Sequence, residues 1–188
     1  VVAAFIEDKP QELVKYMQTC NEKRKELQQQ ITLQAQKASL SYESDNILFL
    51  GGDWHKGVVG IAASRISEVF WKPVWLFDKS KKDTYYGSAR SIAGFDLVAA
   101  MRSQSELFDK FGGHKMAAGF SFPAKNAEKI RLGLNEYSKK IRSENENFWN
   151  SKIHYDATLC DKLLNSNLVN VIDEMRPFGF GFEEPLFK

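Results

Sequence analysis

Short apolar runs alternate along the chain with longer stretches in which apolar residues recur at helical spacing. The short runs predict strands at 46–50, 73–77, 84–90 and 116–122. The helical spacing predicts helices at 58–70, 95–103 and 124–142, and a further helix at 106–111 that ends at the glycine pair 112–113. Strands alternating with helices favour an α/β fold, with a layered sheet-and-helix domain over residues 46–148.

A long helical pattern precedes this domain and runs from Pro10 to about Leu40. Proline suits the first turn of a helix, where its missing N–H costs nothing. The segment 21–30 is almost wholly polar, which is typical of a solvated helix that connects two bodies. We therefore predict that residues 1–45 contain a connector helix.

A polar segment at 143–147 predicts the far boundary of the domain. Beyond it the pattern indicates a strand at 153–158 and a helix at 162–175. The ending, 177–188, is rich in turn residues and aromatic rings, so residues 149–188 are expected to begin another unit, cut short. Because the sequence has no initiator methionine, we expect it to be part of a longer chain.

Composition narrows the class of protein. The 188 residues are 43% hydrophobic and 27% charged, which excludes a disordered or low-complexity chain. The net charge is only +2, so any binding of nucleic acid must depend on a local positive cluster. Two distant cysteines and three scattered histidines exclude a disulfide scaffold and a zinc finger, and favour a reduced, cytoplasmic protein. No apolar run approaches the ~18 residues of a membrane span, so no membrane contact is expected.

The first candidate motif, 51–61, lies where a predicted strand ends and a predicted helix begins. The first N–H groups of a helix are unpaired and its positive pole attracts anions. His55 and Lys56 add donors, and Gly57 lets backbone approach a ligand. The glycine spacing matches neither a Walker nor a dinucleotide fingerprint. The alternative is a plain tight turn, with Trp54 in the core and His55 hydrogen-bonded locally.

The second candidate motif is Gly87-Ser88-Ala89-Arg90-Ser91. On a strand, Ser88 and Arg90 point to one face, where a guanidinium fork and a hydroxyl suit phosphate oxygens. Ser91 follows directly and adds a second hydroxyl. The alternative is a solvated edge strand that carries a surface arginine.

The third candidate motif is Phe111-Gly112-Gly113-His114, followed after two residues by Ala117-Ala118-Gly119. The glycines Gly112, Gly113 and Gly119 expose backbone to a ligand. His114 is a candidate for donating to a phosphate or for stabilising charge on a leaving group. The alternative is a helix cap followed by a core strand.

The carboxylates argue against a complete catalytic centre in this sequence. A two-metal hydrolase needs several clustered Asp and His ligands, whereas the aspartates here are dispersed and no Asp-His-His run occurs. No Gly-x-Ser-x-Gly elbow is present either. The sequence therefore predicts anion binding without an evident catalytic apparatus and no metal site in this chain.

Taken together, segments 54–65, 87–97 and 111–119 resemble, in order and spacing, the RecJ family of bacterial exonucleases specific for single-stranded DNA. They fall in its DHH-associated domain, the second lobe of the DHH phosphoesterase superfamily. The ending 176–187 resembles the entry to that family's oligonucleotide-binding (OB) fold, with Phe182 and Glu183 departing from the usual Asn and Pro. Residues 1–45 fit the tail of the first lobe and its connector.

The resemblance implies that the intact protein degrades single-stranded DNA from its 5′ end. It implies that a divalent ion, Mn²⁺ or Mg²⁺, is held by the Asp-His-His lobe, which this sequence lacks. We expect a monomer, with single-stranded DNA and DNA-repair proteins as partners. The implied substrate contacts are His55, Ser88, Arg90, Ser91, Gly112, Gly113 and His114, with Gly57 and Gly119 as positions of backbone access.

Two alternatives to a single-strand exonuclease stay open at this point. The same superfamily equipment suits a hydrolase of short RNA or of cyclic dinucleotides, and a binding module without catalysis would also lack metal ligands. The ending at 177–187 favours DNA. Trp54 and Tyr86 are candidate stacking rings for bases, although packing in the core is the alternative for each.

Overall fold

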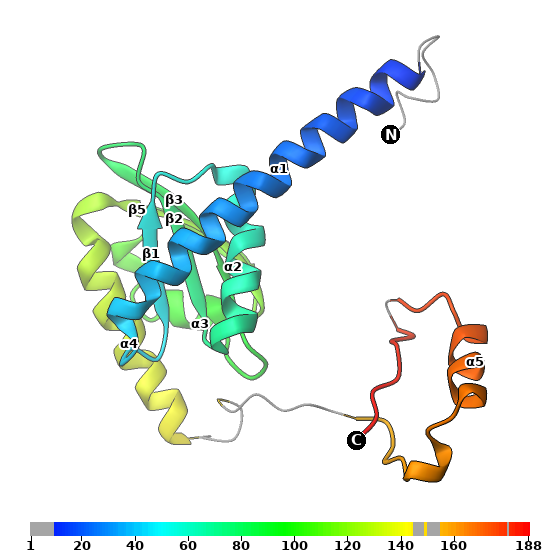
Figure 1. Cartoon of the computed structure of the whole chain (residues 1–188). Coiled ribbons are helices and arrows are strands. Elements are labelled where there is room, and N and C mark those ends of the chain that lie inside the picture. Colours follow the sequence, from blue (N-terminus) through cyan, green and yellow to red (C-terminus); the bar gives the residue numbers. More distant parts are fainter. Residues whose placement is uncertain (1–9, 145–148, 150–154, 180) are drawn as a thin grey trace. The chain divides into compact units, whose positions relative to one another are not determined.

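The computed structural model describes residues 10–144, 149, 155–179 and 181–188. The chain divides into two compact units, Val1–Asn150 and Ser151–Lys188, and each is described by itself (Figure 1). Among the described residues, no helix combines the length and apolar character needed to cross a membrane.

The first unit is built on a five-stranded mixed sheet with the order β1-β2-β3-β5-β4. Its strands are β1 (Leu48–Gly52), β2 (Val74–Asp78), β3 (Thr84–Arg90), β4 (Lys110–His114) and β5 (Ala117–Pro123). Its helices are α1 (Pro10–Ser39), α2 (Lys56–Phe70), α3 (Leu97–Arg102) and α4 (Ala127–Glu144), with short 3-10 turns at Leu40–Tyr42, Ser105–Leu107 and Ala124–Asn126. Strands β1 and β2 are connected by α2 and pair in parallel, and the other strand pairs are antiparallel.

Helices pack on both faces of the sheet, each through its own cluster of buried apolar side chains. On one face, α2 and the second half of α1 pack on β1 and β2 through a buried cluster that includes Ile31, Ala62 and Leu76. On the other face, α3 and α4 pack over an aromatic cluster that includes Phe120 and Phe122. Removing these side chains from water is the main favourable term in the stability of such a sandwich. The α/β fold class predicted from the sequence is confirmed.

Helix α1 changes character along its length. Its second half carries the buried Ile31 and Ala35, whereas the described residues from Gln11 to Asn21 are nearly all exposed. Figure 1 shows the first half extending past the sheet and its covering helices. The polar segment predicted to be a solvated connector is therefore helical and largely exposed.

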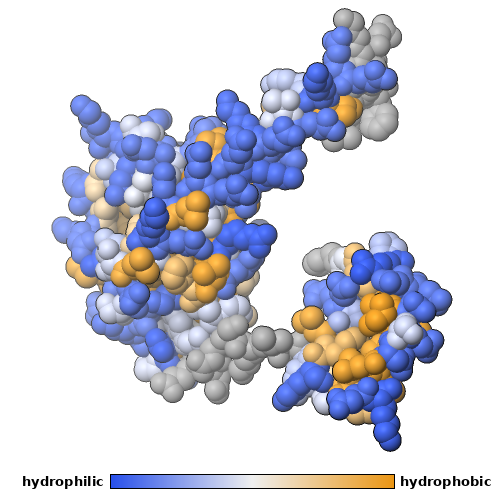
Figure 2. Space-filling view, in the orientation of Figure 1, coloured by the Kyte–Doolittle hydropathy of each residue, from blue (hydrophilic) through white to orange (hydrophobic). Residues whose placement is uncertain are grey.

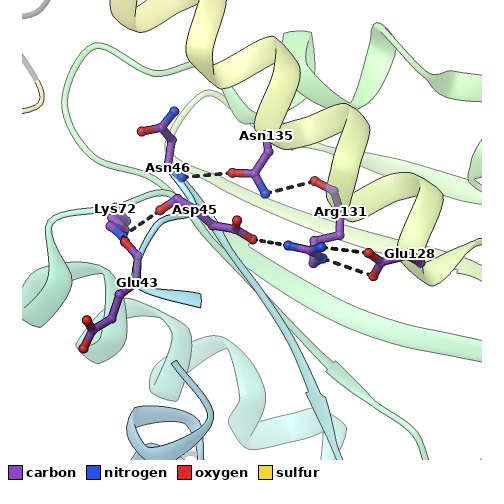
Figure 3. A network of polar contacts seen from close by, with 7 residues as sticks. All are labelled: Glu43, Asp45, Asn46, Lys72, Glu128, Arg131 and Asn135. Carbon is purple, nitrogen blue, oxygen red and sulfur yellow. Dashed lines mark hydrogen bonds and ion pairs between the residues drawn. The ribbon is translucent and has the colours of Figure 1, made fainter. Parts of the chain in front are cut away.

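A polar network fixes the segment that leads into β1 (Figure 3). The Arg131 guanidinium on α4 binds the Asp45 and Glu128 carboxylates, and hydrogen bonding to Arg131 lowers the pKa of Glu128. The Asp45 and Arg131 side chains are each less than a fifth exposed, so this pair is shielded from solvent. The other contacts join Asn135 to the Asn46 N–H at 2.9 Å, and the Lys72 ammonium to the Glu43 and Asp45 carbonyls at 2.9 and 2.6 Å.

The second unit contains α5 (Ser166–Glu174) and a 3-10 turn at Asp161–Leu163. Single bridges join Ala157 to Phe187 and Gly179 to Phe182. None of the described residues of this unit is buried. Figure 2 shows hydrophobic side chains gathered on its visible face, and the exposed apolar residues include Leu163, Leu164, Val169, Val171, Met175 and Leu186.

Most predicted elements are present, with three corrections. The predicted helix at 106–111 is wrong: its first two residues lie in the 3-10 turn Ser105–Leu107, and its last two belong to β4, where Phe111 pairs with Phe120 and Gly112 with Gly119. The first strand begins and ends two residues later than predicted. In the second unit, the helix predicted at 162–175 is shortened to α5, and Ala157 makes only a bridge where a strand was predicted at 153–158. Residues 145–147 of the predicted break, and 153 and 154 of the predicted strand, lie outside the described residues.

The Arg131 network predicts a specific loss of stability. Arg131→Ala leaves the shielded Asp45 carboxylate without its partner, so the free energy of unfolding should fall by about 1–3 kcal/mol. Arg65→Ala is the matched control, because the Arg65–Glu68 pair is more than 60% exposed on both sides. Its loss should stay below about 0.5 kcal/mol. Urea unfolding of the two variants measures the difference, and equal losses would contradict this account of the network.

Candidate functional site

The residues of the second and third motifs lie side by side on one face of the sheet. In neighbouring antiparallel strands, directly opposed residues point to the same face. Ser88 on β3 opposes Gly119 on β5, which opposes Gly112 on β4. The adjacent row is Arg90, Ala117 and His114. Two motifs far apart in the sequence are thus joined in two rows by strand pairing.

This face is only partly covered by helix α2. The helix lies over the β3 side, where Ser64 contacts Arg90 and Ser67 contacts the Ser91 carbonyl. On β5 and β4, Ala117, Gly119 and the segment 112–114 are all exposed. The site is therefore an open strip of sheet with α2 along one side.

Arg90 is held by three hydrogen bonds but has no acidic partner among the described residues. Its Nε donates to the Ser64 hydroxyl at 3.1 Å, and its Nη1 donates to the Ser88 hydroxyl and the Ala89 carbonyl, both at 2.8 Å. Among the described residues no carboxylate forms an ion pair with it. Burial lowers the pKa of Arg90, as expected for a cation partly removed from water, and an arginine remains charged at neutral pH. A half-buried, uncompensated guanidinium of this kind is typical of a binding site for an anion.

Gly60 and Ser64 of α2 complete the arginine site, and the sequence analysis did not single them out. A side chain at Gly60 would place its Cβ 2.9 Å from Arg90 Nη2 and 3.0 Å from Ser88 Oγ. A larger residue at position 60 would therefore crowd the guanidinium and the hydroxyl and displace the arginine from this position. The available signal was the spacing of Gly60 and Ser64, four residues apart and therefore on one helix face.

The glycines of the third motif have different structural roles. At Gly112 and Gly119 an added Cβ would meet nothing within 4 Å, so these two glycines form a bare floor beside Ser88. Gly113 has a φ of +143°, and its Cβ would collide with the Ala117 carbonyl. Glycine at position 113 is therefore a structural requirement of β4 where it pairs with Ala118.

His114 and Ser91 differ in whether their side chains are free to contact a ligand. His114 is exposed at the end of β4, two strands from Arg90, or about 10 Å across the sheet. The Ser91 hydroxyl donates to the Phe95 carbonyl at 2.7 Å, so its proton is already engaged. Contact of Ser91 with substrate stays a prediction, and the hydrogen bond to Phe95 also accounts for the position of this side chain.

His55 lines a separate hollow at the start of α2, and Gly57 is the second residue of that helix. His55 caps the helix, with its Nδ1 accepting from the Gly57 N–H at 3.2 Å. Trp54 is 4% exposed, and its Nε1 donates to Gln34 of α1 at 2.7 Å, so it belongs to the core and is not a stacking ring. The alternative interpretation of the first motif is correct for Trp54. The solvated-edge alternative for the second motif is wrong, because β3 is the central strand.

The site lacks the ligands of a metal centre. Within the part of the chain that the structure describes, no group of three or more His, Cys, Asp or Glu side chains is placed to hold a metal ion. The chemistry that these residues offer is recognition of an anion by hydrogen bonds and charge.

Fold and site together define an α/β domain that presents a half-buried arginine over bare glycine backbone, a class suited to gripping anionic ligands. The model of the DHHA1 domain matches residues 44–141, more than half of the sequence, and the chain belongs to that family.

Curated relatives extend the likeness beyond the domain. The chain is 30% identical over 186 residues to the single-stranded-DNA-specific exonuclease RecJ of Escherichia coli, covering 93% of this chain and 32% of that protein. It is 34% identical over 154 residues to RecJ of Thermus thermophilus, covering 77% of this chain and 20% of that protein. The crystal structure of Thermus thermophilus RecJ in complex with Mg²⁺ matches with a TM-score of 0.80 at 25% identity, covering 98% of this chain and 29% of that one. The resemblance to RecJ drawn from the motifs is confirmed, and the chain spans about a third of the E. coli relative.

Substitutions at Gly113 and Gly119 are predicted to differ in how strongly they affect stability. Gly113→Ala should lower the free energy of unfolding by at least about 1–3 kcal/mol, because the new Cβ is strained at positive φ and collides with backbone. Gly119→Ala is the matched control on the paired strand and should change stability by less than about 1 kcal/mol, since its Cβ enters open space. Chemical denaturation of both variants checks the assignment. A tolerant Gly113 would contradict it.

Proposed function

We propose that this chain is the substrate-binding portion of an exonuclease that degrades single-stranded DNA from the 5′ end. The observation that carries the proposal is Arg90, a half-buried guanidinium fixed by two hydroxyls and a carbonyl but matched by no carboxylate in the described residues. A phosphate of the DNA backbone supplies the missing negative charge and accepts from the remaining N–H groups.

The surroundings of Arg90 suit a single strand. Ser88 adds a hydroxyl beside the guanidinium, and the floor of Gly112 and Gly119 admits a sugar–phosphate chain close to backbone. His114 lies across this floor and is assigned to a second phosphate or to charge on the leaving group. Binding through the phosphate chain alone carries no sequence preference, as a degradative nuclease requires.

Catalysis is assigned to a part of the intact protein outside this sequence. The similar solved structures include RecJ in complex with Mg²⁺ and with Mn²⁺, which supports the presence of a divalent ion in the whole enzyme. We assign residues 1–45 to the connector, 46–148 to the DHH-associated domain and 149–188 to the start of an OB fold. A monomeric state, DNA-repair partners and a cytoplasmic location remain predictions.

Arg90→Ala in the intact protein should weaken binding of a single-stranded oligonucleotide at least tenfold, which corresponds to about 1.4 kcal/mol. The physical reason is the loss of a bidentate, charge-assisted contact. Arg102→Ala on the opposite face is the control, because Arg102 is exposed on α3, and it should bind like the parent. Equilibrium binding at fixed salt measures both, and parent-like affinity for Arg90→Ala would remove it from the site.

The chain by itself should show no nuclease activity when Mn²⁺ or Mg²⁺ is supplied, because its described residues offer no metal cluster. It should still bind single-stranded DNA weakly, with affinity falling as salt rises. Degradation of a labelled oligonucleotide by the purified chain is the measurement. Turnover that follows the protein through successive purification steps would overturn this division of labour.

A further inference from the structure

The hollow beside the arginine site lies at the carboxyl ends of the two parallel strands. It has a volume of about 470 Å³ and is lined by residues after β1, after β2 and at the start of β3, namely Asp53, Trp54, His55, Lys56, Asp78, Ser80, Lys81 and Tyr86. In open α/β sheets the crevice outside the carboxyl ends of the strands is the usual place for a ligand. The argument for the function proposed above uses none of these residues, although His55 is among the substrate contacts predicted from the sequence.

The charge of the hollow differs from that of the arginine site. Lys56 and Lys81 are balanced by Asp53 and Asp78, and the Asp78 carboxylate already accepts from the Ser80 N–H at 2.9 Å and hydroxyl at 2.7 Å. A balanced set of this kind does not favour a second phosphate. It suits a neutral, flat group that presents both an apolar surface and polar edges.

Tyr86 supplies the matching surface. Its side chain is 45% exposed, whereas the other aromatic ring of the hollow, Trp54, is buried. The Lys81 ammonium lies 5.1 Å from the centre of the Tyr86 ring and so covers one face of it. Lys81 is an exposed, flexible side chain that a ligand can displace.

The tyrosine is aligned with the arginine along one strand. Tyr86, Ser88 and Arg90 alternate on β3 and so share a face, with about 13–14 Å between the first and the last. Ser121 and Gly119 lie opposite Tyr86 and Ser88 on β5, and both are small. A chain gripped at Arg90 can therefore follow the β3–β5 strip to the tyrosine without meeting a large side chain from β5.

We propose that the hollow at Tyr86 is a nucleobase subsite, in which the tyrosine ring stacks one base of the same strand whose phosphate is held by Arg90. This inference rests on the proposed function and extends it from phosphate to base. Stacking needs only a π-face, so the subsite accepts any base and adds affinity without sequence preference. Lys81 leaves the ring when the base arrives and turns toward the strand.

The experiment uses the intact protein without divalent metal, so that DNA is bound but not cut. Short thymidine oligonucleotides carry a single abasic nucleotide, placed at each position from the 5′ end in turn. For the parent, one position should weaken binding by between about fivefold and a hundredfold, the range expected for one stacked base. Tyr86→Leu, which keeps apolar bulk, should lose a similar factor with the unmodified oligonucleotide and no longer respond to that position. Tyr86→Phe, the matched control, should keep both the affinity and the response.

The outcomes separate this inference from the function on which it rests. If Tyr86→Leu binds like the parent and responds to the same abasic position, the base subsite is wrong. If Arg90→Ala is weakened while Tyr86→Leu is not, the phosphate grip stands and only the subsite fails. If neither substitution matters, the proposed function fails together with it. Thermal unfolding of each variant shows whether a lost affinity reflects lost folding, and the exposed position of Tyr86 predicts unchanged curves.

Discussion

The half-buried charge of Arg90 is the constraint around which the site is organised. Taking a guanidinium out of water costs free energy, and two hydroxyls and a carbonyl offset only part of it because none carries a full negative charge. The fold holds this cation in place before any ligand arrives. A ligand that brings a negative charge then gains the interaction without paying to order the arginine, which is the advantage of preorganisation.

The layers of the fold explain why this charge remains open to solvent on one side. Helix α2 covers β1, β2 and the near edge of β3, and Gly60 lets it come close enough for Ser64 to reach Arg90. On the same face of the sheet, Gly119 of β5 and Gly112 of β4 are exposed, and no described part of the chain covers them. The stabilising aromatic cluster and the Arg131 network lie elsewhere, on the α4 side and at the entry to β1 (Figure 3). Stability and binding thus depend largely on different residues.

Sequence periodicity was most reliable where one face of an element is buried. The apolar stripe of α2 and the run at β2 were predicted because burial enforces a strict pattern. The segment 106–111 misled the prediction because the glycine pair that follows it signals a helix end equally well. Only pairing with β5, which places Phe111 against the core rings and Gly112 opposite Gly119, decides that a strand begins at Lys110. Such pairing joins residues distant in sequence, and local propensity does not encode it.

The sequence by itself determined the kinds of residue available for binding: an arginine two places from a serine on a strand, glycines that permit close approach, and no clustered metal ligands. It also carried the likeness to the exonuclease family, since motif order and spacing are properties of the chain alone. The tertiary structure decided which of these residues share a surface. Pairing with β5 places Arg90 and His114 in one row across the sheet, and the backbone at Gly113 requires glycine. Packing buries Trp54 in the core and leaves Tyr86 exposed. The physical reason is that exposure and proximity are set by packing between elements, which depends on the whole sheet at once.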